Sequence, residues 1–490
     1  MTKQLFLDDY IVEEMAGLKR VMHQAQKYAG KPIISPESPW EKCTGVCYLY
    51  GTVLKVGDND FRLWYQIVDK DGKGLIAYAT SYDGIHWEKP ILDIYEWQGS
   101  RENNILLVGE IPCVFYEPEE ADPQKRFKMF YFPGWRYLFG YAVSFSPDGL
   151  HWSGYQGKLP GGDVGHCFYD FQHNQYVATA KVYTFLNGSV RRAIGMARPL
   201  RSTGKLDEGW QPTAWTGELD EQWEPAPLVL GPDQLDDTMA RGRIGAREPI
   251  IQHRNPAVNC AHFYGMPVFP YGDAYLGLLW VFDNCSSPLA SGGQDGPVEV
   301  QLAFSRDLIN WARIGERNPF IPLGELGQWD CGMVYTANGP VRVGDELWFY
   351  YGGFNVTHGD EVLHPPFQGI DVTGKGGAIG LAKLRVDGFV SLDAGQAGGV
   401  LVTKPFILEG KTLELNVAAK GGEMRVELLD GETGKVVPGF IKERCEPFCG
   451  DLVAYRPSWQ GSSLPGQLLG RPIRLKFFLR NASLFAFRFC

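Results

Sequence analysis

The sequence predicts an all-β protein, a five-bladed β-propeller followed by a small C-terminal β-sandwich, and three observations support this fold class. Five segments repeat one pattern, in which a short strand runs into a turn and then an aromatic residue. The 490 residues include 60 glycines and 32 prolines, as expected for a chain dense in turns. A repeat of tens of residues, too small to bury its own apolar face, is typical of stacked or radial architectures.

The repeated unit supplies the outer strands of the predicted blades. Its copies are YATSYDGIHW at 78–87, YAVSFSPDGLHW at 141–152, a longer variant at 194–210, LAFSRDLINW at 302–311 and IGLAKLRVDGF at 379–389. Asp-Gly and Arg-Asp-Leu sequences accommodate a positive φ or an Asx-type cap. The tryptophan that follows the turn is predicted to pack against a sheet.

A pair of inner strands precedes each copy. The pairs are expected at 51–56 with 61–68, 113–117 with 126–132, 166–171 with 175–182, 262–269 with 274–282, and 332–343 with 346–352. Turn sequences such as Gly57-Asp58 separate the two members, as a hairpin demands. The spacing of the blades is uneven, so residues 211–260 are predicted to hold a large insertion on the functional face.

Two domains are predicted, with the propeller at 1–395 and the sandwich at 402–490. The intervening GQAGGVL at 395–401 is typical of a linker. Beyond it, strands that alternate apolar and polar residues are expected at 413–417, 424–429, 473–479 and 484–489.

Composition excludes several classes of function. With 47 Lys and Arg against 57 Asp and Glu, the net charge is −10, and no basic run is long enough to follow a nucleic acid. No apolar stretch approaches the roughly 18 residues of a membrane span. Residues 1–15 lack the apolar centre of a secretory signal, so a soluble, cytoplasmic protein is expected. The ten scattered cysteines fit buried thiols in a reducing compartment.

Candidate catalytic carboxylates stand where the inner strands begin. In a propeller these positions converge on one axial channel, and here they include Glu41, Glu110, Asp163 and Asp330. Glycoside hydrolysis needs two carboxyl groups, one protonated as acid and one ionised as nucleophile or base. Asp163 and Asp330 fit best, since each lies between a glycine-containing turn and a strand, and Glu41 is the third candidate. The alternative for each is a carboxylate that only caps its turn.

Six further residues are predicted to contact a sugar: Asp9, His166, His262, Tyr264, Trp329 and Glu248. Either histidine could bind hydroxyl groups, and Trp329 could stack on the apolar face of a sugar ring. Asp9 follows an N-terminal strand that is expected to close the ring by joining the last blade, and Glu248 could overhang the pocket from the insertion. The alternatives are structural histidines, a packing tryptophan and solvated loop carboxylates.

Other chemistries lack their signatures. The sequence has no G-x-S-x-G elbow and no phosphate-binding loop. No cofactor and no catalytic metal are expected, although the channel could hold a structural Ca²⁺.

These motifs resemble those of the five-bladed glycoside hydrolases, the group that contains families 32 and 43, and most of all bacterial family 32-like proteins. The resemblance rests on the S-x-DG-x-HW units, GDVGHCFYD, the WDCGMVY to YYGG segment, IGLAKLRVDGFVSLDAG and the trailing strands. The W-x-N-D-P-N-G, R-D-P and E-C motifs of family 32 are not intact here. The resemblance implies a carbohydrate-active pocket and leaves the sugar and the stereochemical outcome open.

The leading hypothesis is therefore a glycosidase that acts on small oligosaccharides through a pair of carboxylates in the axial pocket. One alternative is a non-catalytic carbohydrate-binding propeller. Another is a glycoside phosphorylase, for which Arg241, Arg243 and Arg247 could hold inorganic phosphate. A carbohydrate is the expected partner, without nucleic acid or membrane, and the sequence does not predict an oligomeric state.

Overall fold

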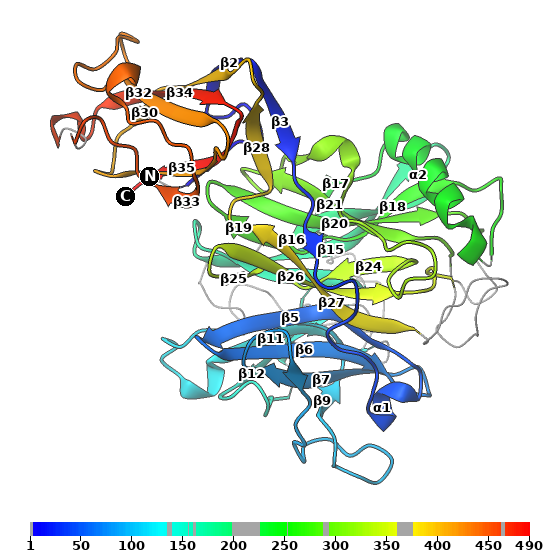
Figure 1. Cartoon of the computed structure of the whole chain (residues 1–490). Coiled ribbons are helices and arrows are strands. Elements are labelled where there is room, and N and C mark those ends of the chain that lie inside the picture. Colours follow the sequence, from blue (N-terminus) through cyan, green and yellow to red (C-terminus); the bar gives the residue numbers. More distant parts are fainter. Residues whose placement is uncertain are drawn as a thin grey trace.

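The computed structural model describes residues 3–134, 140–154, 156–159, 163–197, 226–251, 253–287, 294–359, 376–461 and 466–490. Strands dominate (Figure 1), which confirms the predicted all-β class. Helices are few, and the described ones are α1 (Pro39–Lys42), α2 (Gln234–Arg247) and the 3₁₀ turns Pro123–Lys125, Glu248–Ile250, Gly315–Arg317, Lys442–Arg444 and Gly466–Leu468.

Three antiparallel sheets follow one another along the first half of the chain. The first contains β5 (Cys47–Gly57), β6 (Asp60–Val68), β7 (Gly74–Ser81), β8 (Trp87–Glu88) and β9 (Ile105–Val108). The second contains β10 (Glu110–Tyr116), β11 (Phe127–Phe132), β12 (Tyr141–Ser146) and β13 (Gln156–Leu159). The third contains β14 (Gly165–Asp170), β15 (Gln175–Leu186), β16 (Ser189–Ala197) and β17 (Leu228–Leu230).

Two further antiparallel units share one 11-stranded sheet. The fourth unit contains β18 (Cys260–Gly265), β19 (Val268–Tyr271), β20 (Ala274–Asn284), β21 (Val298–Ser305), β22 (Trp311–Arg313) and β23 (Pro319–Ile321). The fifth contains β24 (Met333–Thr336), β25 (Val341–Val343), β26 (Glu346–Phe354), β27 (Gly377–Arg385) and β4 (Gln26–Lys27). A single parallel pairing, Val298 with Met333, joins the two units.

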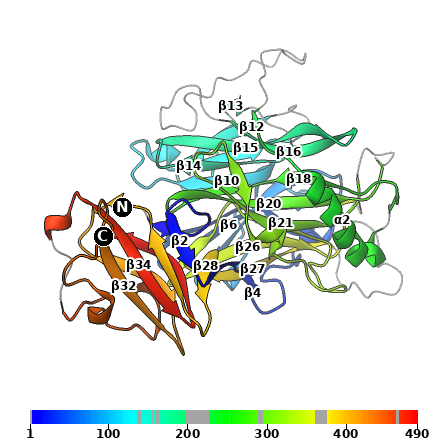
Figure 2. The same cartoon turned by 90° about the horizontal axis from the view of Figure 1, so that it is seen from above.

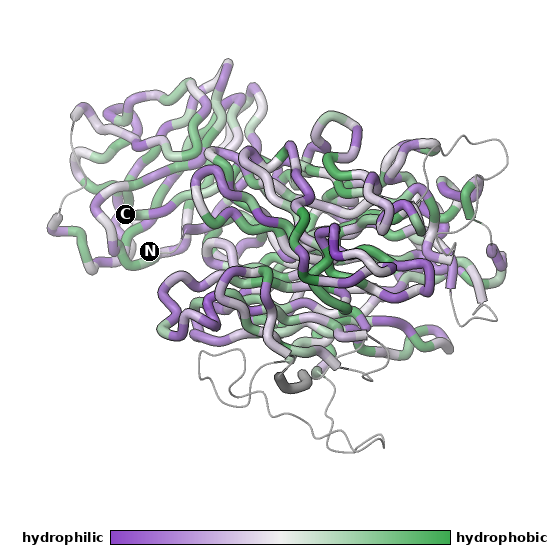
Figure 3. Tube along the Cα trace, turned by 90° about the horizontal axis from the view of Figure 1, so that it is seen from below, coloured by the Kyte–Doolittle hydropathy of each residue, from purple (hydrophilic) through white to green (hydrophobic). Residues whose placement is uncertain are grey.

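Apolar cores join these five units in a cyclic order. Each core joins two neighbouring units, and the last core joins the fifth unit to the first. The core of the fourth and fifth units also includes Tyr48, Ile111 and Val164 from the other three. Representative members of the five cores, in chain order, are Trp64 and Met129, Tyr141 and Ala178, Val177 and Phe263, Trp280 and Tyr335, and Tyr65 and Tyr350. The hydropathy-coloured trace shows apolar segments running through the stacked strands (Figure 3).

Two more sheets enclose a separate core near the chain ends. One contains β1 (Gln4–Leu5), β3 (Leu18–Met22), β28 (Val390–Ala394), β31 (Leu413–Ala418), β33 (Asp451–Tyr455) and β35 (Ala482–Phe489). The other contains β2 (Val12–Ala16), β29 (Gly399–Thr403), β30 (Phe406–Ile407), β32 (Glu423–Asp430) and β34 (Pro472–Arg480). In Figures 1 and 2 the blue N-terminal strands lie beside these orange and red ones. The division of the chain at 395 stays a prediction.

The expectation that the strand before Asp9 joins the last blade is wrong. That strand, β1, pairs with β35, and β4 pairs with β27 instead. The physical reason is the alternation of side chains in the extended segment. Leu5 and Leu7 are buried in the core of the fourth and fifth units, whereas Phe6 is buried among the C-terminal strands.

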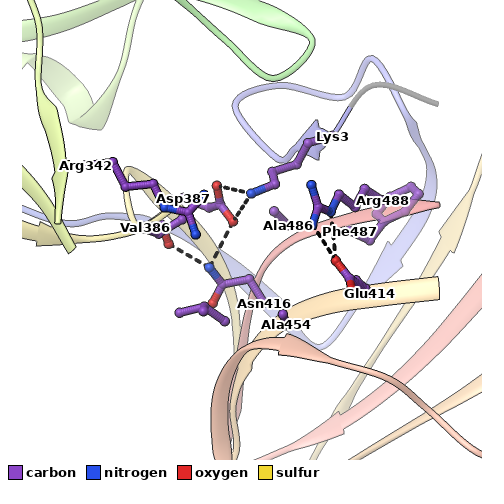
Figure 4. A pocket seen from close by; sticks show the side chains of 11 residues that line it. Lys3, Arg342, Val386, Asp387, Glu414, Asn416, Ala454, Ala486, Phe487 and Arg488 are labelled. Atoms are coloured by element: carbon purple, nitrogen blue, oxygen red, sulfur yellow. Dashed lines mark hydrogen bonds and ion pairs between the residues drawn. The ribbon is translucent and has the colours of Figure 1, made fainter. Parts of the chain in front are cut away.

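Polar contacts at this junction surround Asp387, as Figure 4 shows. Lys3 Nζ donates to both carboxylate oxygens at 2.8 and 2.9 Å, Asn416 Nδ2 donates at 3.0 Å, and the Tyr271 hydroxyl donates at 2.7 Å. The cavity beside them measures about 40 Å³, room for a few waters. These contacts link the last turn of the fifth unit to the N-terminal and C-terminal strands.

The repeated turn is an Asx-type cap, as the sequence predicts. In the first copy, the Asp83 carboxylate accepts from the backbone N–H groups of Ile85 and His86 at 2.8 Å, and Ser81 Oγ accepts from Gly84 N–H. The second copy repeats this arrangement around Asp148.

Candidate active site

Each of the five units contributes one polar or aromatic residue, at or near the start of its first strand, to a common region. These residues are Tyr48 of β5, Glu110 of β10, Asp163 just before β14, Tyr264 of β18 and Tyr335 of β24. Burial raises the pKa of Tyr48, and the nearby Glu110, Tyr264 and Tyr335 raise it further. Desolvation raises the pKa of the partly buried Tyr264, and the charges of Asp163 and Glu110 raise it further. Five segments that are far apart in sequence thus form one electrostatically coupled cluster, which we call the central cluster.

Two carboxyl groups of the central cluster differ in their surroundings. Burial raises the pKa of Glu110, a hydrogen bond from Gln66 opposes this, and the charge of Asp163 raises it further. Asp163 instead forms an ion pair with Lys181 Nζ of β15. Glu110 therefore keeps its proton to a higher pH than an ordinary glutamate does.

Lys181 and Arg192 bring two cations to the ring of Tyr264. Lys181 Nζ lies 5.5 Å and Arg192 Cζ 5.7 Å from the ring centroid. Burial lowers the pKa of Lys181, and the charge of Asp163 opposes that shift. On its other side, Tyr264 shares a hydrogen bond of 3.1 Å between its hydroxyl and Nε2 of His358. Arg192 also donates to Gln294 Oε1 at 2.6 Å.

Aromatic rings form one wall of the central cluster. Tyr50 lies edge-to-face against Tyr48 and Tyr335, with centroids 4.9 and 4.7 Å apart, and its ring is 5.2 Å from that of Trp280. Tyr335 continues the row to Tyr264 at 5.7 Å. Such rings can pack against the apolar C–H face of a sugar.

Both predicted histidines lie against this cluster as neutral rings. Nδ1 of His262 accepts from the backbone N–H of Arg192 at 3.1 Å, and burial together with nearby cations lowers its pKa to about 3. Nδ1 of His166 pairs with Asn338 Oδ1 at 2.9 Å, and burial lowers its pKa to about 4. The His166 ring stands perpendicular to Trp280 at 4.8 Å. Within the described part of the chain, His166 Nε2 has no hydrogen-bond partner.

Asp330 and Trp329 contact residues that are not part of the central cluster. Asp330 Oδ2 accepts from Lys27 Nζ at 2.5 Å and from the Tyr351 hydroxyl at 3.0 Å. Trp329 stacks on Tyr351 with centroids 5.5 Å apart and an interplanar angle of 20°. Lys27 belongs to β4, so these contacts attach β4 to the other strands of the fifth unit.

Glu41 lies at the start of α1, where it completes a capping box with Ser38. Its Oε2 accepts from the backbone N–H of Glu37 and Ser38 at 3.0 Å and from Lys89 Nζ at 2.7 Å. Its Oε1 accepts from the Tyr65 hydroxyl at 2.6 Å. Both oxygens of this buried carboxylate are therefore occupied by protein donors.

The structure places the remaining predicted residues at exposed positions. Asp9 pairs with Arg20 beside the N-terminal strands, and Glu248 pairs with Arg254 at the end of α2. Of the arginines considered for phosphate, Arg243 is bound to the buried Asp283 by two hydrogen bonds. Asp9 and Glu248 thus have their ion-pair partners outside the central cluster. Of the predicted insertion, residues 211–225 lie outside the described residues.

From the sequence, Glu110 was one of the carboxylates at the strand starts but had no predicted role. Lys181, Arg192 and His358 were not predicted to belong to the site. A signal existed for Lys181, because it interrupts the apolar strand QYVATAKV. A charged residue in such a strand requires a buried partner, which Asp163 supplies.

The described residues contain neither a metal-binding cluster nor a membrane-spanning helix. No group of three or more His, Cys, Asp or Glu side chains among them could hold a metal ion. None of their helices is long and apolar enough to cross a membrane.

No family model matches the chain, and no curated protein matches its sequence. Solved structures do match it. A β-1,2-mannobiose phosphorylase from Listeria innocua is 12% identical with a TM-score of 0.44, over 74% of this chain and 96% of that one. A glycosyl hydrolase from Bacteroides ovatus is 13% identical with a TM-score of 0.42, over 74% and 94%. A thermostable family-43 glycoside hydrolase is 12% identical with a TM-score of 0.41, over 71% and 93%. Glycoside hydrolases, the group that the sequence resembles, are thus among the solved structures that are similar to this chain.

Proposed function

We propose that this chain is a glycosidase with the fold of a five-bladed propeller and a C-terminal sandwich, and that Glu110 and Asp163 form its carboxyl pair. The cyclic order of the five apolar cores and the meeting of five first strands support the propeller. The two sheets around the separate core support the sandwich. The predicted pairing of Asp163 with Asp330, and the role of Glu41, stay predictions.

The observation that carries the proposal is the unequal environment of two neighbouring carboxyl groups. Burial and the charge of Asp163 favour the protonated form of Glu110, as a general acid requires. Asp163 lies in contact with the ammonium group of Lys181 and its side chain is 26% exposed, so it can be reached by a substrate, as a nucleophile or base requires.

In the proposed reaction, Glu110 donates its proton to the glycosidic oxygen while the C–O bond breaks. Asp163 either attacks the anomeric carbon, forming a glycosyl ester that water then hydrolyses with Glu110 as base, or removes a proton from a water molecule that attacks this carbon directly. Hydrolysis consumes one water molecule, whose oxygen ends on the anomeric carbon, while the leaving sugar gains a proton. Tyr50 and Tyr264, which are only partly buried, are proposed to pack against the sugar ring and keep bulk water from the reacting centre.

The test is hydrolysis of three sugars: β-1,2-mannobiose, xylotriose and β-1,3-galactobiose. The first is named with the phosphorylase above, and the other two follow the names of two further similar structures, a GH62 hydrolase in complex with xylotriose and a putative exo-β-1,3-galactanase. We expect the wild-type chain to release reducing sugar from at least one of them, and Asp163→Asn to abolish this release. Binding measured by calorimetry without release would instead support the non-catalytic propeller. Undiminished release by Asp163→Asn would remove the proposed pair.

A phosphorylase is the second candidate, because Lys181 and Arg192 place two cations beside Tyr264 and near Asp163. Paired cations are suited to bind phosphate oxygens. Incubation of the same sugars with and without inorganic phosphate separates the candidates. A sugar 1-phosphate detected by mass spectrometry would indicate phosphorolysis, and phosphate-independent release would indicate hydrolysis.

A further inference from the structure

The hairpin of β15 and β16 carries an unusual stripe of side chains. Tyr183 is paired with Arg192, and Phe185 with Val190. Residues two apart on a strand, and residues directly opposite on its antiparallel partner, share a face of the sheet. Lys181, Tyr183 and Phe185 therefore follow one another on one face, with Arg192 and Val190 beside them. We call Tyr183, Phe185 and Val190 the hairpin stripe.

The stripe begins beside the central cluster. Lys181, its neighbour on the same face, holds Asp163 in an ion pair. Tyr183 is two residues beyond Lys181 on the same face of β15, so it is the next side chain along from the lysine that contacts the proposed nucleophile or base.

The stripe is nevertheless open to solvent. Tyr183 is 63% exposed, Phe185 70% and Val190 60%. The hairpin also has contacts to α2, since Arg191 and Asn187 both donate to the Asp237 carboxylate. A row of large exposed apolar side chains is costly unless a ligand covers it.

We propose that Tyr183 and Phe185 form a stacking subsite for the sugar unit next to the bond that Glu110 and Asp163 break. This inference rests on the proposed function. Residues two apart on a strand are about 7 Å apart, so the two rings can support neighbouring parts of one sugar chain. The apolar C–H face of a sugar ring packs on an aromatic face, and its hydroxyl groups remain free for Lys181, Arg192 or water.

The occupant is a carbohydrate rather than a peptide because the stripe is continuous with the carboxyl pair. Phe185, Tyr183 and Lys181 follow one another on this face, and Lys181 contacts Asp163. The enzyme therefore takes oligosaccharides in preference to single sugars. The rings act on binding and orientation and take no part in the bond-breaking step.

The test compares the double variant Tyr183→Ala/Phe185→Ala with the wild type on two kinds of substrate. The first kind is an oligosaccharide from the panel that the wild type cleaves. The second is the fluoride of its terminal sugar, which has one ring only and cannot reach the stripe. We expect kcat/KM to fall about tenfold for the oligosaccharide and less than about twofold for the fluoride. Equal losses on both substrates, or no loss on either, would overturn the subsite.

Two controls sharpen this comparison. Tyr82→Ala removes a tyrosine that is 73% exposed on the outer turn of the first unit, and it should leave both substrates unaffected. Tyr183→Phe keeps the ring and should keep most of the oligosaccharide activity, unless the hydroxyl rather than the stacking surface matters.

Binding separates failure of the subsite from failure of the proposed function. If the wild type binds one of the three oligosaccharides but cleaves neither kind of substrate, the glycosidase proposal fails. A tenfold weaker calorimetric affinity in the double variant would then still support the subsite. If the wild type binds none of the three, the subsite is overturned.

Discussion

Asp163 and Asp330 look alike in the sequence, yet the structure gives them different neighbourhoods. Each follows a glycine-containing turn, precedes a strand and pairs with a lysine. The Asp330 side chain is 2% exposed and is held by Lys27 and the Tyr351 hydroxyl, whereas that of Asp163 is 26% exposed beside Glu110 and Tyr183. The difference teaches that accessibility and the neighbouring titrating groups distinguish a chemical role from a structural one.

The largest expected effect is the loss of activity when Asp163 is replaced, which tests whether Asp163 rather than Asp330 has the chemical role. Asp163→Asn removes the negative charge and should reduce kcat about thousandfold, the effect of losing a nucleophile or general base. The amide keeps the shape of the side chain but leaves the buried ammonium group of Lys181 without a counter-charge, so the melting temperature should fall as well, and kcat is measured well below it. Steady-state kinetics on the cleaved oligosaccharide measure the loss. A variant that keeps full activity would return the choice of carboxylate to Asp330.

The next largest effect concerns the contribution of Asp330, through its contacts with Lys27 and Tyr351, to the stability of the fold. Asp330→Asn leaves the buried ammonium of Lys27 without a counter-charge, which should lower the free energy of unfolding by about 3 kcal/mol. Urea unfolding followed by tryptophan fluorescence measures it. Lys27→Met in the same background should recover part of the loss, because no unpaired charge then remains buried. A stable but inactive Asp330→Asn would instead favour the pair predicted from the sequence.

A change at Glu110 sharpens the comparison through pH. The raised pKa keeps Glu110 protonated above the usual 4.5 of a glutamate, so the decline of kcat/KM on the basic side should lie above that value. Glu110→Gln should remove this decline and reduce oligosaccharide cleavage about hundredfold. Cleavage of a glycosyl fluoride needs no protonation of the leaving group and should be far less affected. An unchanged pH profile would show that another group is the acid.

The smallest effect comes from a carboxylate that only caps a turn. Burial alone would raise the pKa of Asp148, but hydrogen bonds from His151 and Leu150 bring it down to about 2. Asp148→Ala should cost about 1 kcal/mol of stability, as the loss of a helix N-cap does, and should leave activity unchanged. Thermal unfolding together with the hydrolysis assay checks both parts. A large loss of activity would mean that the outer turns influence the central cluster.

Much of the local structure was predictable from the sequence. The strands of all five units, the Asx-type turns and the alternating C-terminal strands follow from patterns that span a few residues each. The N-terminal strands were not predictable in the same way. Their side chains alternate between two cores, and only the folded chain shows that β1 pairs with β35 while β4 pairs with β27.

The sequence by itself determined the repeated unit, the class of fold and the set of acidic residues at the strand starts. The tertiary structure alone decided that Glu110 and Asp163 are neighbours, that Lys181 pairs with Asp163, and that Glu41 and Asp330 are held by other donors. The reason is physical. Turns and strands depend on neighbours in the chain, whereas burial, ion pairing and the pKa of a carboxyl group depend on segments that meet only after the sheets have packed.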